Sequence, residues 1–146
     1  FFLHGSWMHL IGNAYYFFVF GDDVEDDMTL SEFVKFLFWG HVSGLVLHSV
    51  MTGFSSVPLI GASAGISALL GYYMVRFPAR QISFMIFFFV VWAHLPAFGV
   101  FLWKFGWEYL VASTGPATNV AHWAHLGGAI YGFFAATQKG KASMTQ

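Results

Sequence analysis

Apolar residues fall into five long runs along this 146-residue chain, and these runs limit what it can fold into. They cover residues 7–20, 33–50, 59–77, 82–102 and 118–136. A helix that crosses a membrane needs about 17–25 mostly apolar residues, and all runs but the first have that length. The chain is 58% hydrophobic and only 9% charged, whereas soluble domains carry about 25% charged residues. The pattern predicts an all-α, polytopic membrane helical bundle rather than a soluble protein with buried helices.

Charge and cysteine content narrow the function classes. A net charge of −1 provides no basic surface, so we expect no nucleic-acid partner. The absence of cysteine excludes disulfides and thiol redox chemistry. No pattern calls for a cofactor or a metal, and the chain has no His-Glu-x-x-His motif of zinc proteases. We expect one membrane domain over residues 1–146, truncated at its N-terminus because Phe1 stands directly before the first run.

The positive charges predict how the runs are oriented. If all five span the membrane, one side receives five basic residues: Lys35, Arg76, Arg80, Lys139 and Lys141. Only Lys104 falls on the other side, in a loop expected from about Trp103 to Pro116. Because Lys and Arg favour the cytoplasmic side, the chain should begin outside and end inside. The first, third and fifth runs then all start at the outer side.

Four polar residues stand near the starts of those three runs: His9, Asn13, Ser63 and His125. Polar and ionisable residues inside a membrane are costly and usually face the bundle interior or a wet cavity. Because the three runs share one direction, these side chains should lie at a similar depth. The topology therefore predicts that they converge on one site below the outer surface.

The four residue types fit serine-based hydrolysis. Ser63 is a weak nucleophile unless a base takes its proton, and His125 is the natural base. No Asp or Glu lies near His125 in the sequence, so we expect a Ser–His dyad rather than a triad. Asn13, His9 and the backbone N–H of Ser63, at the start of a helix, are candidate donors to an oxyanion.

Small residues predict where the helices meet closely. Ser67 and Gly71 follow Ser63 at four-residue steps. Gly128 and Gly132, one turn after His125, are also four residues apart. Small residues at such spacing let membrane helices approach closely. We add Gly61, just before Ser63, to this set of close-packing positions.

Three segments together resemble the rhomboid family of intramembrane serine proteases. They are the His4-x4-His9-x3-Asn13 pattern, the segment Gly61-Ala62-Ser63, and Ala124-His125 followed by Gly128 and Gly132. The resemblance implies that Ser63 is the nucleophile, that His125 is the base, and that His9 and Asn13 line the oxyanion site. It also implies transmembrane protein substrates that are cleaved within the lipid bilayer.

The chain departs from the family pattern in three respects. Five of the six core transmembrane helices are present, and the one before His4 is absent. Ala64 stands where the family usually has Gly. Ser67 stands where some members place an aromatic that packs on the catalytic histidine. Another residue must therefore orient His125 here, or activity is weaker.

Two other functions stay open. The first is a catalytically inactive rhomboid-like protein that binds membrane clients. The second is a haem protein with two histidine ligands, for which the candidates are His41, His48, His94 and His122. For the protease, we expect a bacterial inner membrane, with the active site toward the periplasmic side.

Overall fold

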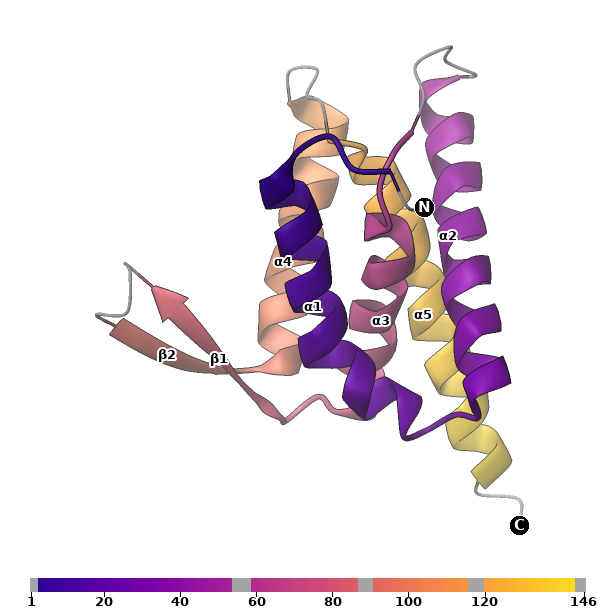
Figure 1. Cartoon of the computed structure of the whole chain (residues 1–146), viewed down its shortest axis with the longest axis vertical. Coiled ribbons are helices and arrows are strands. Elements are labelled where there is room, and N and C mark those ends of the chain that lie inside the picture. The colour runs from indigo at the N-terminus through magenta and orange to yellow at the C-terminus, as the bar shows by residue number, and fades with distance from the viewer. Residues whose placement is uncertain (1–2, 54–58, 87–90, 116–119, 144–146) are drawn as a thin grey trace.

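The computed structural model of the protein describes residues 3–53, 59–86, 91–115 and 120–143. This part of the chain contains five helices and one two-stranded hairpin (Figure 1). In chain order they are α1 (Trp7–Glu25), α2 (Leu30–Thr52), α3 (Ser63–Arg76), β1 (Gln81–Ile86), β2 (Val91–Pro96), α4 (Ala97–Thr114) and α5 (His122–Ser143). The helices form one bundle, so the predicted all-α, rhomboid-like fold is confirmed.

Helix α3 is the centre of this bundle. It packs against each of the other four helices, and its residues from Ala64 to Tyr73 are all buried. Helices α1, α3 and α5 run in one direction, and α2 and α4 run in the other (Figure 1). As the topology predicted, the N-terminal ends of α1, α3 and α5 lie toward the same end of the bundle.

Glycine brings α3 and α5 into backbone contact. A Cβ atom at Gly128 would lie 2.0 Å from the carbonyl oxygen of Ala64, and one at Gly132 would lie 1.9 Å from that of Ala68. From the other side, a Cβ at Gly71 would lie 2.1 Å from the carbonyl oxygen of Ala129. Only a residue without a side chain fits such spaces, so these glycines determine how closely and in what register the two helices pack.

An acidic and basic cluster closes the opposite end of α3. Arg76 Nε donates to Asp27 Oδ2 at 2.8 Å, and the Tyr72 hydroxyl donates to the same oxygen at 3.2 Å. The hydrogen bond from Arg76 lowers the pKa of the Asp27 carboxyl below its ordinary value. Arg80 donates to Asp23 Oδ1, and the Tyr73 hydroxyl donates to Asp23 Oδ2 at 2.9 Å. These contacts join the end of α1 to the end of α3.

Local sequence signals account for two helix ends. Thr29 and Glu32 form a capping box at the start of α2, with the Thr29 N–H donating to Glu32 Oε2 at 2.8 Å. Helix α3 ends at Arg76, two residues before Pro78, because the residue before a proline disfavours the helical conformation.

The fourth apolar run differs from its prediction. The sequence predicted a membrane-spanning helix over 82–102, but β1 and β2 pair antiparallel there, with Gln81 opposite Pro96 and Ile86 opposite Val91. The helix starts only after Pro96, which lacks a backbone N–H and restricts the residue before it. The predicted outer loop from Trp103 is also wrong, because α4 continues to Thr114.

The number of helices able to cross a membrane is also smaller than expected. Of the helices in the described ranges, α2 alone is long and apolar enough by length and composition. Helix α3 has 14 residues, which corresponds to about 21 Å, whereas the hydrocarbon core is about 30 Å thick. The bounds of the apolar runs in the sequence did not reveal where each helix begins and ends.

Candidate active site

A glycine turn places Ser63 at the first position of α3. Gly61 has a φ of +108°, a backbone conformation that residues with a Cβ rarely adopt. The turn leads through Ala62 into the helix, and no side chain caps the N-terminus. The first N–H groups of a helix have no partner within it, so they face whatever lies beside Ser63. The positive end of the helix dipole points the same way.

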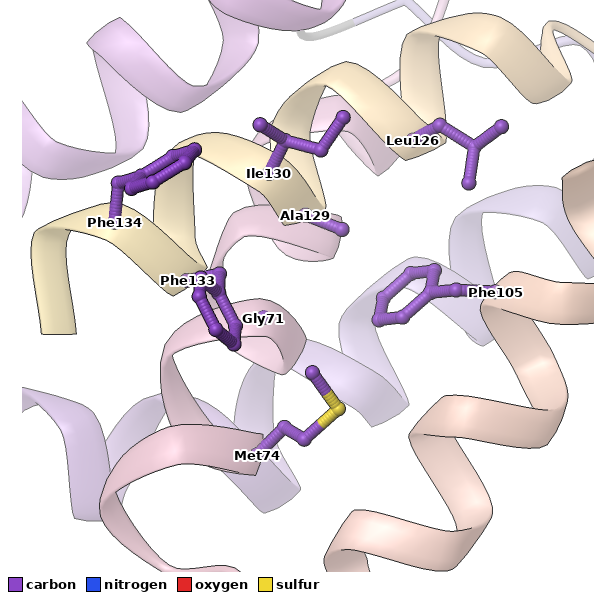
Figure 2. A pocket seen from close by; sticks show the side chains of 8 residues that line it. All are labelled: Gly71, Met74, Phe105, Leu126, Ala129, Ile130, Phe133 and Phe134. Carbon is purple, nitrogen blue, oxygen red and sulfur yellow. The ribbon is translucent and has the colours of Figure 1, made fainter. Parts of the chain in front are cut away.

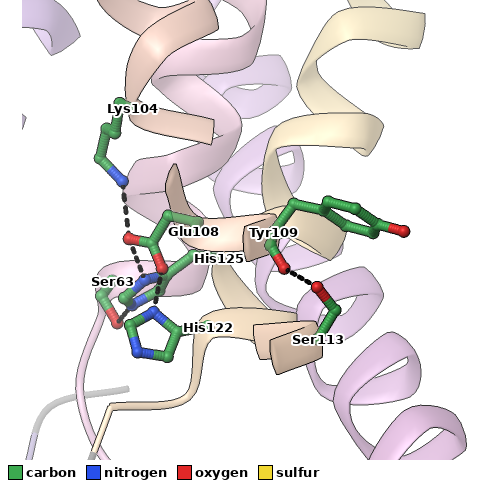
Figure 3. Close-up of polar contacts among 7 residues, drawn as sticks. All are labelled: Ser63, Lys104, Glu108, Tyr109, Ser113, His122 and His125. Carbon is green, nitrogen blue, oxygen red and sulfur yellow. Dashed lines mark hydrogen bonds and ion pairs between the residues drawn. The ribbon is translucent and has the colours of Figure 1, made fainter. Parts of the chain in front are cut away.

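His125 comes from the first turn of α5 and meets Ser63 directly. Its Nε2 lies 2.9 Å from Ser63 Oγ (Figure 3). The close packing of Gly128 against Ala64 explains the approach, because these residues stand beside the two functional positions on their own helices. The structure thus joins two predicted site residues that are 62 positions apart in the sequence.

Glu108 of α4 approaches the other side of the His125 ring. Its Oε1 lies 3.0 Å from His125 Nδ1, and its Oε2 contacts Nδ1 of His122 (Figure 3). Lys104 Nζ lies 3.1 Å from Oε1. The Glu108 side chain is only 12% exposed. The expectation that His125 has no acidic partner is therefore wrong.

That error came from judging proximity along the chain. Glu108 is 17 residues before His125, in a segment predicted to be an outer loop. One sequence signal could have revealed it: Lys104 and Glu108 have the four-residue spacing of a helical ion pair. A helix there would have placed both charges on one face.

Among the described residues, Glu108, His122 and His125 also form a candidate metal site. Donor atoms of Glu108, His122 and His125 all lie within 4.8 Å of one another. Zinc–nitrogen bonds of about 2.0–2.1 Å place tetrahedral ligands roughly 3.3 Å apart. The 3.0 Å between His125 and Glu108 is shorter and is a hydrogen-bond distance. The geometry fits proton placement better than a metal.

His9 and Asn13 lie beside the turn that precedes Ser63. A Cβ on Gly61 would be 2.8 Å from His9 Cε1 and 3.7 Å from Asn13 Nδ2. Ser6 caps α1 by accepting a hydrogen bond from the His9 N–H at 3.1 Å, which orients the first turn. Within the described residues, the buried Nδ2 of Asn13 has no hydrogen-bond partner. The site therefore contains an unused amide donor.

His4 packs edge-on against His9, with ring centroids 5.1 Å apart, and His122 contacts Glu108. The other histidines do not join this site. His41 and His48 belong to α2, and His94 is an exposed residue of β2 rather than the middle of a helix. The hairpin that carries His94 extends away from the bundle (Figure 1). A haem site that uses His94 requires this residue to lie on a helix, and His94 lies on a strand.

A cavity of about 320 Å³ lies between α3, α4 and α5 (Figure 2). Its lining is apolar and includes Gly71, Phe105, Leu126 and Phe133. It offers no polar group that could bind or transform a substrate. This cavity is therefore not a candidate for the chemistry, and none of its lining residues belongs to the cluster around Ser63.

The fold and the site together define a helical membrane protein with a serine–histidine pair at one end of its bundle. The model of the Rhomboid domain matches residues 1–141, and the chain therefore belongs to the rhomboid family. Members of this family are membrane proteins and typically intramembrane serine proteases. No curated protein and no solved structure matches the chain.

Proposed function

We propose that this protein is a serine-type intramembrane endopeptidase that cleaves transmembrane segments of other membrane proteins. The observation that carries the proposal is the 2.9 Å contact between Ser63 Oγ and His125 Nε2. This distance lies within hydrogen-bond reach, which a nucleophile and its general base require. Family membership makes peptide hydrolysis the reaction to expect of such a pair.

The reaction follows from the two side chains. His125 Nε2 takes the hydroxyl proton as Ser63 Oγ attacks the carbonyl carbon of the scissile peptide. The C–N bond then breaks, and His125 gives the proton to the leaving amine. A water molecule, activated by the same imidazole, hydrolyses the resulting acyl-enzyme and regenerates Ser63.

Three donors are available for the negative charge on the carbonyl oxygen. They are Asn13 Nδ2, the backbone N–H of Ser63 and the His9 ring. The evidence is strongest for Asn13, because its buried Nδ2 has no hydrogen-bond partner within the described residues. Burying such a donor without a partner lowers the stability of the fold by about 1–3 kcal/mol. A donor kept unused in the resting protein is preorganised for an oxyanion.

Substrate class follows from where the site lies. A transmembrane helix satisfies its own backbone hydrogen bonds, so it must unwind locally before a carbonyl reaches Ser63. Arg76 and Arg80 stand at the opposite end of α3 from Ser63. Since basic residues favour the cytoplasmic side, we place the site near the outer leaflet. We further propose that the membrane is a bacterial inner membrane, with the site toward the periplasm.

Fluorophosphonate labelling of the purified protein in detergent tests this function. The wild type should be labelled, and Ser63→Ala and His125→Ala should not. Ser113→Ala is the matched control and should leave labelling unchanged, because among the described residues Ser113 bonds only carbonyl oxygens of its own helix. A folded wild type without labelling would instead indicate an inactive rhomboid-like protein that binds membrane clients.

A further inference from the structure

Glu108 is a largely buried carboxylate in contact with the imidazole that serves as the base. We infer that Glu108 is a positioning residue, which holds His125 in the tautomer and orientation that accept the Ser63 proton. The inference rests on the proposed function, and it replaces the expected dyad with a chain of three side chains from α3, α5 and α4. Its basis is the pair of contacts on the two His125 nitrogens, at 2.9 Å and 3.0 Å.

The chemistry of the two contacts determines the tautomer. An ionised carboxylate only accepts hydrogen bonds, so His125 Nδ1 must carry the proton that points at Glu108. In a neutral imidazole the other nitrogen is then the acceptor. That nitrogen, Nε2, faces Ser63 Oγ. The contact with Glu108 therefore selects the form of His125 that can act as a base.

Glu108 is itself held in place from two sides. His122 contacts its Oε2, and Lys104 contacts its Oε1 from one turn earlier on α4. A buried charge is tolerated when it is paired and hydrogen-bonded, and these partners supply both conditions. The carboxylate thus has little freedom to rotate. Because it contacts Nδ1 of His125, it also limits rotation of the His125 ring.

Glu108 also acts on the charge that appears during the reaction. Once His125 has taken the Ser63 proton, the imidazolium lies against a carboxylate, which stabilises it. Several other groups surround it: Lys104 beside the carboxylate, His122 on α5, Ser63 on α3 and His9 on α1, close enough to interact with it electrostatically. Lys104 offsets part of the effect of Glu108.

The first test reads the tautomer without any substrate. Two-bond ¹H–¹⁵N correlation spectra of ¹⁵N-histidine-labelled protein distinguish the two neutral tautomers, and His125→Gln assigns the signal. At alkaline pH the wild type should show His125 protonated at Nδ1, and Glu108→Gln should lose this preference. Finding His125 protonated at Nε2 in the wild type would overturn the inference, even if the variants were inactive or unfolded.

The second test uses kinetics on a transmembrane peptide substrate. Glu108→Gln should lower kcat by about 10²–10⁴-fold with little change in KM. Glu108→Asp should recover at least tenfold of the lost kcat. A purely structural role would lower the stability of Glu108→Gln and leave the kcat of the folded protein unchanged.

The controls separate this inference from the function on which it rests. Glu25→Gln removes an exposed acid remote from the site and should match the wild type. If the wild type is labelled and turns over while Glu108→Gln has the same kcat and the same His125 tautomer, the positioning role is wrong and the protease stands. If the folded wild type is not labelled, the protease is wrong, and the histidine spectra still decide the contact with Glu108.

Discussion

Gly128 of α5 lies against the backbone of Ala64 of α3, with room for no side chain between them. A Cβ at residue 128 would come within 2.0 Å of the Ala64 carbonyl oxygen. Ser63, the proposed nucleophile, directly precedes Ala64 on α3, and His125 stands three residues before Gly128 on α5. The spacing of these two helices therefore controls how far Ser63 stands from His125.

Replacing Gly128 by valine should force the two helices apart. We expect a loss of stability of about 1–3 kcal/mol or more from overpacking, together with loss of fluorophosphonate labelling. Thermal unfolding in detergent and the labelling assay measure the two effects. Gly106→Val is the matched control, since a Cβ at Gly106 meets no atom within 4 Å. Normal labelling and stability in Gly128→Val would show that the close contact is unnecessary.

Removing the Asn13 amide should affect turnover without affecting the fold. Asn13→Ala is expected to lower kcat by roughly 10²–10³-fold, the usual effect of losing one oxyanion donor. Thermal stability should stay the same or rise, because Nδ2 is a buried donor without a hydrogen-bond partner within the described residues. A steady-state assay and an unfolding curve on the same preparation decide the matter. A variant with unchanged kcat and a lower Tm would assign Asn13 a structural role.

Acid should weaken the contact between Asp27 and Arg76. Because the folded state lowers the pKa of Asp27, the carboxylate stabilises the fold above the ordinary pKa near 3.9, and this contribution disappears as pH falls through the lower folded value. For a partly exposed pair it is about 1 kcal/mol or less. The wild type should exceed Asp27→Asn in Tm at pH 7, and this advantage should shrink steadily as pH falls below about 4. The exposed Asp22→Asn should show no such difference.

Several features could be predicted from the sequence because they depend on nearby residues or on alternation of helix direction. The capping box of Thr29 and Glu32 and the helix end before Pro78 are local. Ser63 opens α3 because Gly61 adopts a conformation that suits glycine. The approach of Ser63 to His125 was predicted from topology alone, since two helices running in the same direction bring their first turns to one level.

The fourth run shows where such reasoning fails. Apolar composition is the same whether a segment becomes a helix or a hairpin, so run length did not reveal β1 and β2. Pro96 is the local signal that separates this hairpin from α4. Once α4 is shifted to Ala97–Thr114, a segment expected to be a loop becomes a helix beside the site.

By itself, the sequence determined the class of the protein, the direction of its helices and the serine and histidine that meet. These depend on composition, on short-range spacing and on the alternation of helix direction. Only the tertiary structure decided what lies behind His125. Glu108 reaches it across a gap of 17 residues, from a helix whose placement depends on packing rather than on any local pattern. The contact between Glu108 and His125 depends on how α4 packs against α5. The order of residues along the chain does not give the distance between two side chains on different helices.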